Sequence, residues 1–136
     1  MIKSPVPAVF DHFGGADAAL GVEQPGFADL LELVKSGKAY VKISGAYRAS
    51  KLAPDYPDAA PLAKALIAAN PDRIVWGSDW PHTPKHATHT GGSDVELPFQ
   101  PIDTAGLLAL VPRWLEDDDL VHRVLVDNPA RLYEFE

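Results

Sequence analysis

The fold is decided by residues 73–82, which read RIVWGSDWPH. Residues 74–76 are strong strand formers, whereas Gly77 weakens a strand and Pro81 cannot extend a ladder. A short apolar run between helical patterns is typical of a strand buried on both faces of a parallel sheet. Ligands in such sheets bind beyond the carboxyl ends of the strands. We therefore expect Asp79, which follows this strand, to lie at a functional edge.

Two more strands precede this one along the chain. The pattern predicts strands at 7–12 and 39–44, and helices at 27–36 and 58–70. The helix at 27–36 carries apolar residues at the i, i+3, i+4 and i+7 positions, the stripe of a helix that packs on a sheet. Strand, helix and strand in repetition predict a right-handed parallel α/β unit.

The second strand carries a cation whose direction can be inferred. Val41 and Ile43 alternate with Lys42, so the two apolar residues should face the helices and the ammonium should face the other side of the sheet. A cation on that side needs a carboxylate partner. Asp11 and Asp79 are the candidates, and we favour Asp79 because its position in the strand pattern places it on the same face.

The rest of the chain contains helices and irregular segments. Residues 45–57 and 81–101 show no periodicity, and the second segment is long enough to be a lid or a disordered loop. A helix is expected from about 104, with Pro112 kinking or splitting it. Another is expected over 117–126, and Asn128 should cap a short final helix.

Composition limits the classes of partner. The formal net charge is −7 and the pI is about 5.1, so no basic surface for nucleic acid is expected. There is no cysteine, no apolar leader and no run long enough to span a membrane. These features favour a cytoplasmic protein that acts on a small-molecule substrate without nucleic acid or membrane.

Four stretches together resemble one family. They read DHFGG at 11–15, VKISGAYR at 41–48, WGSDWPH at 76–82 and DNPARLY at 127–133. Their order resembles the C-terminal portion of the TIM-barrel amidohydrolases of the amidohydrolase-related group, particularly the 2-pyrone-4,6-dicarboxylate lactonase branch. A whole (β/α)8 barrel needs at least about 200 residues. The resemblance thus implies a partial TIM barrel: residues 1–136 form the last three strand-helix units, with 81–101 as a long rim loop.

The resemblance also implies roles for individual residues. Asp79 and His12 match the catalytic cluster, with Asp79 as a water-activating base or metal ligand. The lactonase branch works without a metal, so the expected cofactor is either none or a divalent metal such as zinc, held by His12 and Asp79. Arg48 matches a position expected to hold a substrate carboxylate. The other residues expected to contact substrate at the rim are Tyr47, Ser44 and His82.

Other interpretations of these residues remain open. Asp79 could cap a helix or pair structurally with Lys42, and His12 could be a hydrogen-bonded turn residue. Histidines 82, 86 and 89 have metal-ligand spacing on a helix, but Pro84 disfavours that helix.

Two functions therefore compete. The first is a hydrolase for a small carboxylated lactone or ester, with Asp79 activating water. The family's N-terminal His-x-His pair has no counterpart among the five histidines. The second is accordingly a non-catalytic, truncated or self-associating fragment, which needs another copy or a complementing N-terminal half for activity.

Overall fold

The computed structural model describes residues 4–84 and 94–135. Strands and α-helices are interspersed as far as residue 75, and only helices follow in the described part of the chain. The elements are β1 (Ala8–Phe10), α1 (Phe27–Lys35), β2 (Ala39–Lys42), α2 (Ala46–Ala49), α3 (Ala60–Ala69), β3 (Ile74–Val75), α4 (Thr104–Leu115), α5 (Asp118–His122) and α6 (Asn128–Tyr133).

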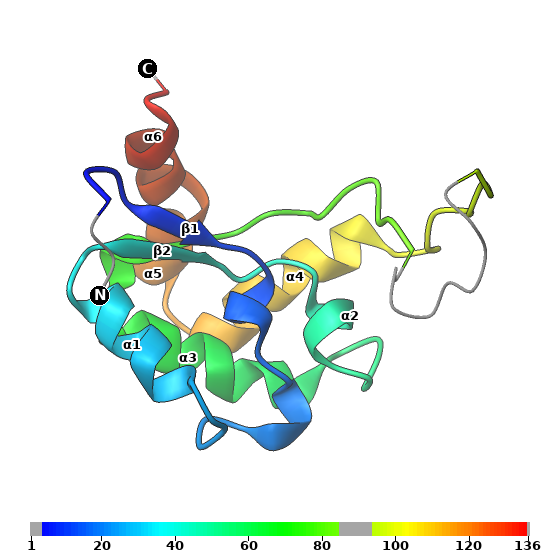
Figure 1. The fold of residues 1–136 in the computed structure, drawn as a ribbon, viewed down its shortest axis with the longest axis horizontal. Coiled ribbons are helices and arrows are strands. Elements are labelled where there is room, and N and C mark those ends of the chain that lie inside the picture. The colour runs from blue at the N-terminus through cyan, green and yellow to red at the C-terminus, as the bar shows by residue number, and fades with distance from the viewer. Residues whose placement is uncertain (1–3, 85–93, 136) are drawn as a thin grey trace.

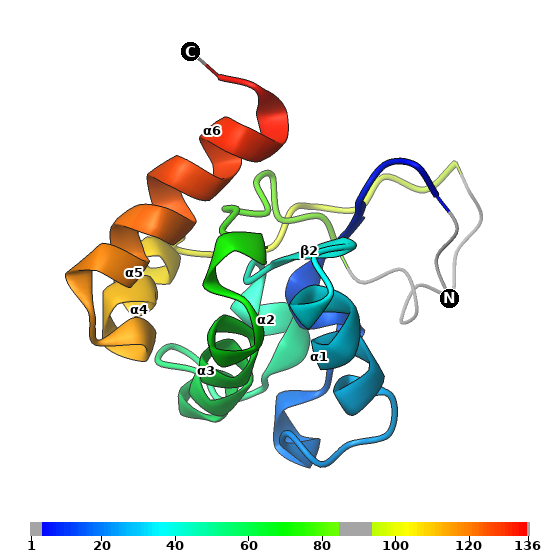
Figure 2. The same cartoon turned by 90° about the vertical axis from the view of Figure 1, so that its left-hand side faces the viewer.

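The three strands form one parallel sheet in the order β1-β2-β3. The chain passes from β1 to β2 through α1 and from β2 to β3 through α3. Figures 1 and 2 show α1 and α3 side by side below the strands, with α6 rising on the opposite side. The predicted α/β unit is confirmed, although each strand is shorter than expected.

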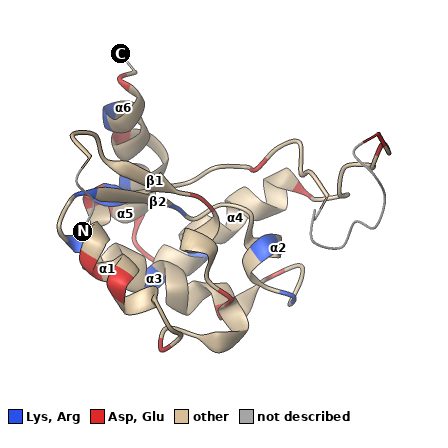
Figure 3. Cartoon of the chain, in the orientation of Figure 1, with Lys and Arg blue, Asp and Glu red and all other residues tan. Residues whose placement is uncertain are grey.

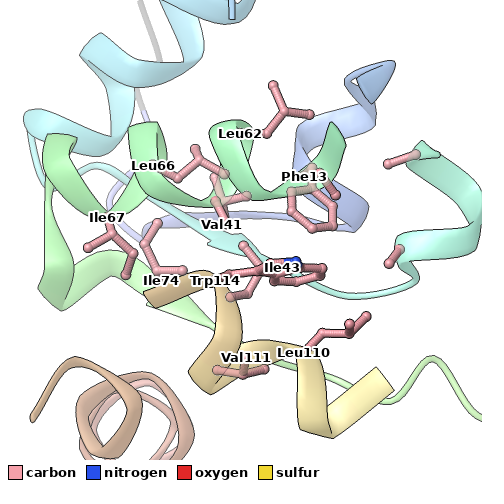
Figure 4. Packing of buried hydrophobic residues seen from close by; sticks show 14 of the residues in the cluster. Phe13, Val41, Ile43, Leu62, Leu66, Ile67, Ile74, Leu110, Val111 and Trp114 are labelled. Carbon is pink, nitrogen blue, oxygen red and sulfur yellow. The ribbon is translucent and has the colours of Figure 1, made fainter. Parts of the chain in front are cut away.

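The core lies between the sheet and the helices. Val41 and Ile43 are fully buried there, as their alternation predicts, and Ile74 of β3 joins them. Figure 4 shows these side chains between Leu62 and Leu66 of α3 and three residues of α4: Leu110, Val111 and Trp114. Side chains that interdigitate at this density hold strand ends and helices in fixed relative positions.

The partner predicted for Lys42 was wrong. The Lys42 ammonium lies 2.9 Å from Oδ1 of Asp11. Phe10 pairs with Val41 in the parallel register, so the next residue along, Asp11, stands opposite Lys42. Val75 is the β3 partner of Lys42, and Asp79 follows Val75 by four residues, beyond the end of the strand. The alternation of residues predicted correctly which face of the sheet Lys42 lies on, but not which carboxylate lies beside it.

Residues 45–57 were expected to be irregular, and this is wrong for their first part. They begin with the single-turn helix α2, whose four residues include Tyr47 and Arg48. Gly45 starts this turn with φ 56°, in the left-handed region that glycine tolerates. A turn of four residues is too short to produce a helical stripe, so periodicity could not reveal it.

The end of the chain also departs from expectation. Helical structure is continuous from α5 through a π-helical turn, η6 (Arg123–Asp127), into α6, so Asn128 caps no new helix. Its side chain is fully buried and its amide donates to the carbonyl oxygens of Pro71 and Ile74, each at 2.7 Å. Asn128 therefore ties α6 to the start of β3. Pro112 likewise does not split α4.

The long segment at 81–101 is only partly described. Its described parts, 81–84 and 94–101, contain no helix or strand. The remainder, including His86 and His89, lies outside the described residues. In the described parts of the chain, no helix has the length and apolar character needed to cross a bilayer. Figure 3 shows basic residues interspersed with acidic ones rather than gathered on one element.

The buried amide of Asn128 gives a test of the fold. Asn128→Asp replaces a double donor by a carboxylate facing two carbonyl oxygens, so the free energy of unfolding should fall by about 3 kcal/mol. Asp127→Asn, at the exposed neighbouring position, should change it by less than about 0.5 kcal/mol. Urea unfolding measures both. Equal effects of the two variants would contradict the anchoring role.

Candidate active site

The carboxyl ends of the three strands bring the candidate residues together. His12 follows β1 by two residues, Ser44 follows β2 by two, and Asp79 follows β3 by four. In a parallel sheet these ends share one edge. Three of the seven non-glycine residues with positive φ in the described chain, namely His12, Asp79 and His82, belong to this region. Backbone strain of this kind concentrates at functional sites.

The Asp79 carboxylate is the centre of the cluster. The Tyr47 hydroxyl and Nε of Arg48 both donate to Oδ2, each at 2.5 Å. The other oxygen, Oδ1, lies 3.7 Å from Nε2 of His12, beyond hydrogen-bond distance. Oδ2 thus accepts two hydrogen bonds, whereas Oδ1 faces His12 without a hydrogen bond to it.

Ser44 orients the imidazole of His12. Its Oγ accepts from the backbone N–H of His12 at 3.3 Å and lies 3.0 Å from Nδ1 of the same residue. A hydroxyl that accepts the backbone proton can donate its own to Nδ1, and this leaves the imidazole proton on Nε2, toward Asp79. The serine thereby favours one tautomer and one ring orientation.

The electrostatic environment keeps Asp79 ionised. Burial alone would raise its pKa, but the hydrogen bonds from Tyr47 and Arg48 and the charges of His12 and Arg48 outweigh burial, so the pKa lies below the usual aspartate value. Burial, together with the hydrogen bond to Asp79, raises the pKa of Tyr47 well above its ordinary value. Tyr47 is therefore a neutral donor at any physiological pH.

A cavity of about 330 Å³ opens beside these groups. His12, Ser44 and Asp79 line it, together with Lys42 and Tyr133 of α6. The cavity lies on the face of the sheet opposite the core, where Lys42 points. It can hold a small molecule in contact with the imidazole and the free carboxylate oxygen.

The structure brings five of the six predicted site residues into this cluster: Asp79, His12, Ser44, Tyr47 and Arg48. His82 lies behind Tyr47, 4% exposed, rather than on the cavity. The sequence analysis missed Tyr133 and Thr104, which come from α6 and from the start of α4. Tyr133 belongs to the stretch 127–133 that carries the resemblance, and Thr104 to the expected start of a helix. Neither could be assigned to the site, because no local pattern places these helices beside the strand ends.

The described chain does not by itself fit a metal site. Catalytic zinc takes three protein ligands as a rule. His12 and Asp79 are two facing donors, and no group of three or more potential ligands occurs among the described residues. A metal here would need ligands from beyond these residues.

Comparisons with known proteins identify the family of this chain. A family model described as amidohydrolase matches residues 1–135. The chain belongs to the amidohydrolase family. The solved apo structure of an Agrobacterium tumefaciens protein superimposes on it with a TM-score of 0.71 at 33% identity, covering 98% of this chain and 44% of the other. The resemblance inferred from the four sequence stretches is confirmed.

Curated amidohydrolase relatives act on lactones, by their names. The chain is 38% identical over 128 residues to the 4-sulfomuconolactone hydrolase of Hydrogenophaga intermedia, over 94% of this chain and 39% of the relative. It is 34% identical over 126 residues to the D-galactarolactone isomerase of Agrobacterium fabrum, over 93% and 40%. It is 32% identical over 138 residues to the 2-pyrone-4,6-dicarboxylate hydrolase of Comamonas testosteroni, over 95% and 41%.

The chain therefore spans about two fifths of the length of these curated relatives. Its three-stranded parallel sheet agrees with a partial amidohydrolase barrel. The predicted fold class is confirmed.

Gly45 offers a first test of the site. A Cβ at this position would lie 2.9 Å from Nδ1 of His12 and 3.1 Å from Oδ2 of Asp79. Gly45→Ala should displace both groups and lower the free energy of unfolding by more than the roughly 1 kcal/mol that positive φ costs an alanine. Gly15→Ala is the matched control, because its φ is also positive and its Cβ would meet nothing within 4 Å. Similar losses from both variants would show that the contact is unimportant.

The lowered pKa of Asp79 predicts a pH dependence of stability. Its pKa in the unfolded chain is about 3.9, and the folded value is lower. The ionised carboxylate thus stabilises the fold above about pH 4, and this contribution is lost as the pH falls through the folded value. Urea unfolding between about pH 5 and pH 3 should show a shallower fall in stability for Asp79→Asn than for the unchanged chain. Parallel curves would refute the assignment.

Proposed function

We propose that this chain carries the C-terminal part of a hydrolytic site for a small carboxylated lactone. The observation that carries the proposal is the arrangement of Asp79: Oδ2 is held by Tyr47 and Arg48, while Oδ1 faces His12 beside a cavity. The names of the lactone-hydrolase relatives support the substrate class.

The proposed reaction begins with a water molecule hydrogen-bonded to Oδ1 of Asp79. Its oxygen attacks the lactone carbonyl carbon as its proton passes to Oδ1. A carboxylate with a lowered pKa is a weak base toward free water, but the proton becomes far more acidic as the new C–O bond forms. The ring C–O bond then breaks, and the departing oxygen takes the proton from Oδ1 of Asp79, which gives a hydroxy acid and restores the carboxylate.

His12 would stabilise the charge that develops on the carbonyl oxygen. With Ser44 on Nδ1, the Nε2 proton points toward the space beside Oδ1, where the substrate carbonyl would lie. A preoriented donor in a site sheltered from water stabilises an oxyanion more than water does. Ser44 therefore acts in the proposal through the tautomer of His12.

Arg48 would hold a substrate carboxylate, but with one nitrogen only. Nε donates to Asp79, and Nη2 donates to the backbone oxygen and hydroxyl of Thr83. Among the described residues, Nη1 has no partner, so it is the nitrogen available to a substrate. A bidentate grip would require Nη2 to leave Thr83.

A chain that performs no turnover alone is the second candidate. Two potential metal ligands, His12 and Asp79, face each other, and no group of three occurs among the described residues. The chain also covers only about two fifths of the length of each relative. Both observations favour this candidate. In that case the remaining groups come from a complementing N-terminal half or from a second copy of this chain. Val9, 40% exposed on the cavity side of the sheet, is part of the apolar surface that such a partner would cover.

The proposal is tested with a panel of carboxylated lactones. Turnover is measured for the chain alone and mixed with the N-terminal part of a lactone-hydrolase relative, with and without zinc. Asp79→Asn should lower kcat by about 100-fold or more, the usual contribution of a general base. Asp55→Asn, which breaks an exposed ion pair with Arg113, is the control and should not change kcat.

The outcomes separate the two candidates. Turnover by the chain alone would show that the short chain builds a working site. Turnover only in the mixture would favour the complemented fragment. Undiminished turnover by Asp79→Asn would refute Asp79 as the base.

A further inference from the structure

His82 is a buried histidine with both ring nitrogens engaged. Nδ1 lies 3.1 Å from the Tyr47 hydroxyl, and Nε2 lies 2.8 Å from Oγ1 of Thr104 at the start of α4. The ring meets that of Tyr47 edge to face, with centroids 5.7 Å apart. With 4% of its surface exposed, His82 is closed off from a substrate but touches a residue that touches Asp79.

The donors and acceptors in this chain of contacts can have only one order. An ionised carboxylate only accepts, so the Tyr47 proton is donated to Oδ2 of Asp79. Toward His82 the Tyr47 oxygen can then act only as an acceptor, which places an imidazole proton on Nδ1. In a neutral ring, Nε2 must accept, and Thr104 is its donor. Three successive donations therefore run from α4 to the carboxylate.

The backbone around His82 holds this arrangement in place. The N–H of His82 donates to the carbonyl of Asp79 at 2.8 Å, and its carbonyl accepts from the N–H of Gln100, also at 2.8 Å. The next residue, Thr83, accepts from Nη2 of Arg48. Two consecutive residues thus each hold one of the two donors that bind Oδ2.

We propose that His82 is a positioning residue for Asp79. It donates from Nδ1 to the Tyr47 hydroxyl, which fixes that hydroxyl as a donor to Oδ2 and leaves Oδ1 as the oxygen that faces His12 and the cavity. Without this donation the hydroxyl could turn toward His82 and leave the carboxylate with Arg48 alone. The consequence for catalysis rests on the proposed function, whereas the relay itself can be tested without turnover.

Two substitutions of His82 separate the relay from simple filling of space. His82→Asn places an amide nitrogen near the position of Nδ1 and keeps a donor for Tyr47. His82→Gln places its amide near the position of Nε2, within reach of Thr104, and loses that donor. Asparagine also tolerates the positive φ of 62° at this position.

The readout is NMR of the folded chain at neutral pH. The 15N shifts of the His82 ring should show the proton on Nδ1. The 13Cζ signal of Tyr47, one of four tyrosines and assignable by Tyr47→Phe, should move in His82→Gln and stay near its original position in His82→Asn. If His82→Gln fails to fold, Thr104→Val replaces it and should weaken the proton's preference for Nδ1.

Several results would overturn the proposal. They are a proton on Nε2 of His82 in the unchanged chain, a Tyr47 signal that neither variant moves, and a signal that both move equally.

In an assembly that turns over lactone, His82→Gln should lower kcat roughly five- to tenfold, the effect of one buried hydrogen bond, with KM little changed. His82→Asn should retain most of kcat. The proposed function is tested separately by the loss of turnover in Asp79→Asn. A wrong assignment of Asp79 as the base can therefore be distinguished from a wrong assignment of His82 as a positioning residue.

Discussion

The hydrogen-bonded carboxylate of Asp79 is the interaction on which the rest of the site depends. A charge that is largely withdrawn from water is tolerated only when donors satisfy it. Here both donors come from the single turn of α2, Tyr47 and Arg48, while His12 approaches from β1. The parallel register of three strands, fixed by the core, is what allows groups more than thirty residues apart to meet. Packing on one face of the sheet thus creates the site at its edge.

Much of the fold could be predicted from the sequence because its signals are local. Alternation in 39–44 correctly predicted that Val41 and Ile43 face the core, and three of the four apolar positions of the stripe in 27–36 are buried. The residues around Asp79 and His12 placed both at strand ends. The partner of Lys42 could not be predicted in this way, because alternation shows which face of the sheet a side chain lies on and not which residue of the neighbouring strand lies opposite. The prediction that Asn128 caps a helix was wrong for a related reason. An Asn-Pro pair is typical of a helix start, but here the side-chain amide of Asn128 donates to Pro71 and Ile74, which are distant in the sequence.

Five members of the candidate site could be predicted from the sequence, but Tyr133, Thr104 and the hydrogen bonds between the members could not. The resemblance to amidohydrolases identified Tyr47, Ser44 and Arg48 as site residues. The sequence does not show that Tyr47 and Arg48 donate to the same oxygen of Asp79. His82 was expected at the rim, and its burial against Tyr47 and Thr104 depends on where α4 packs, more than twenty residues later. Membership of the family leaves the reaction open too, since its relatives include an isomerase as well as hydrolases.

The central claim is that Asp79 directs a water molecule at a lactone carbonyl. The most direct measurement is mass spectrometry of the product formed in H2(18)O by the chain assembled with the N-terminal part of a lactone-hydrolase relative. The account predicts one 18O atom in the product carboxyl group and a mass one water greater than that of the lactone. A product with the mass of the starting lactone and no label would show isomerisation instead and contradict the account.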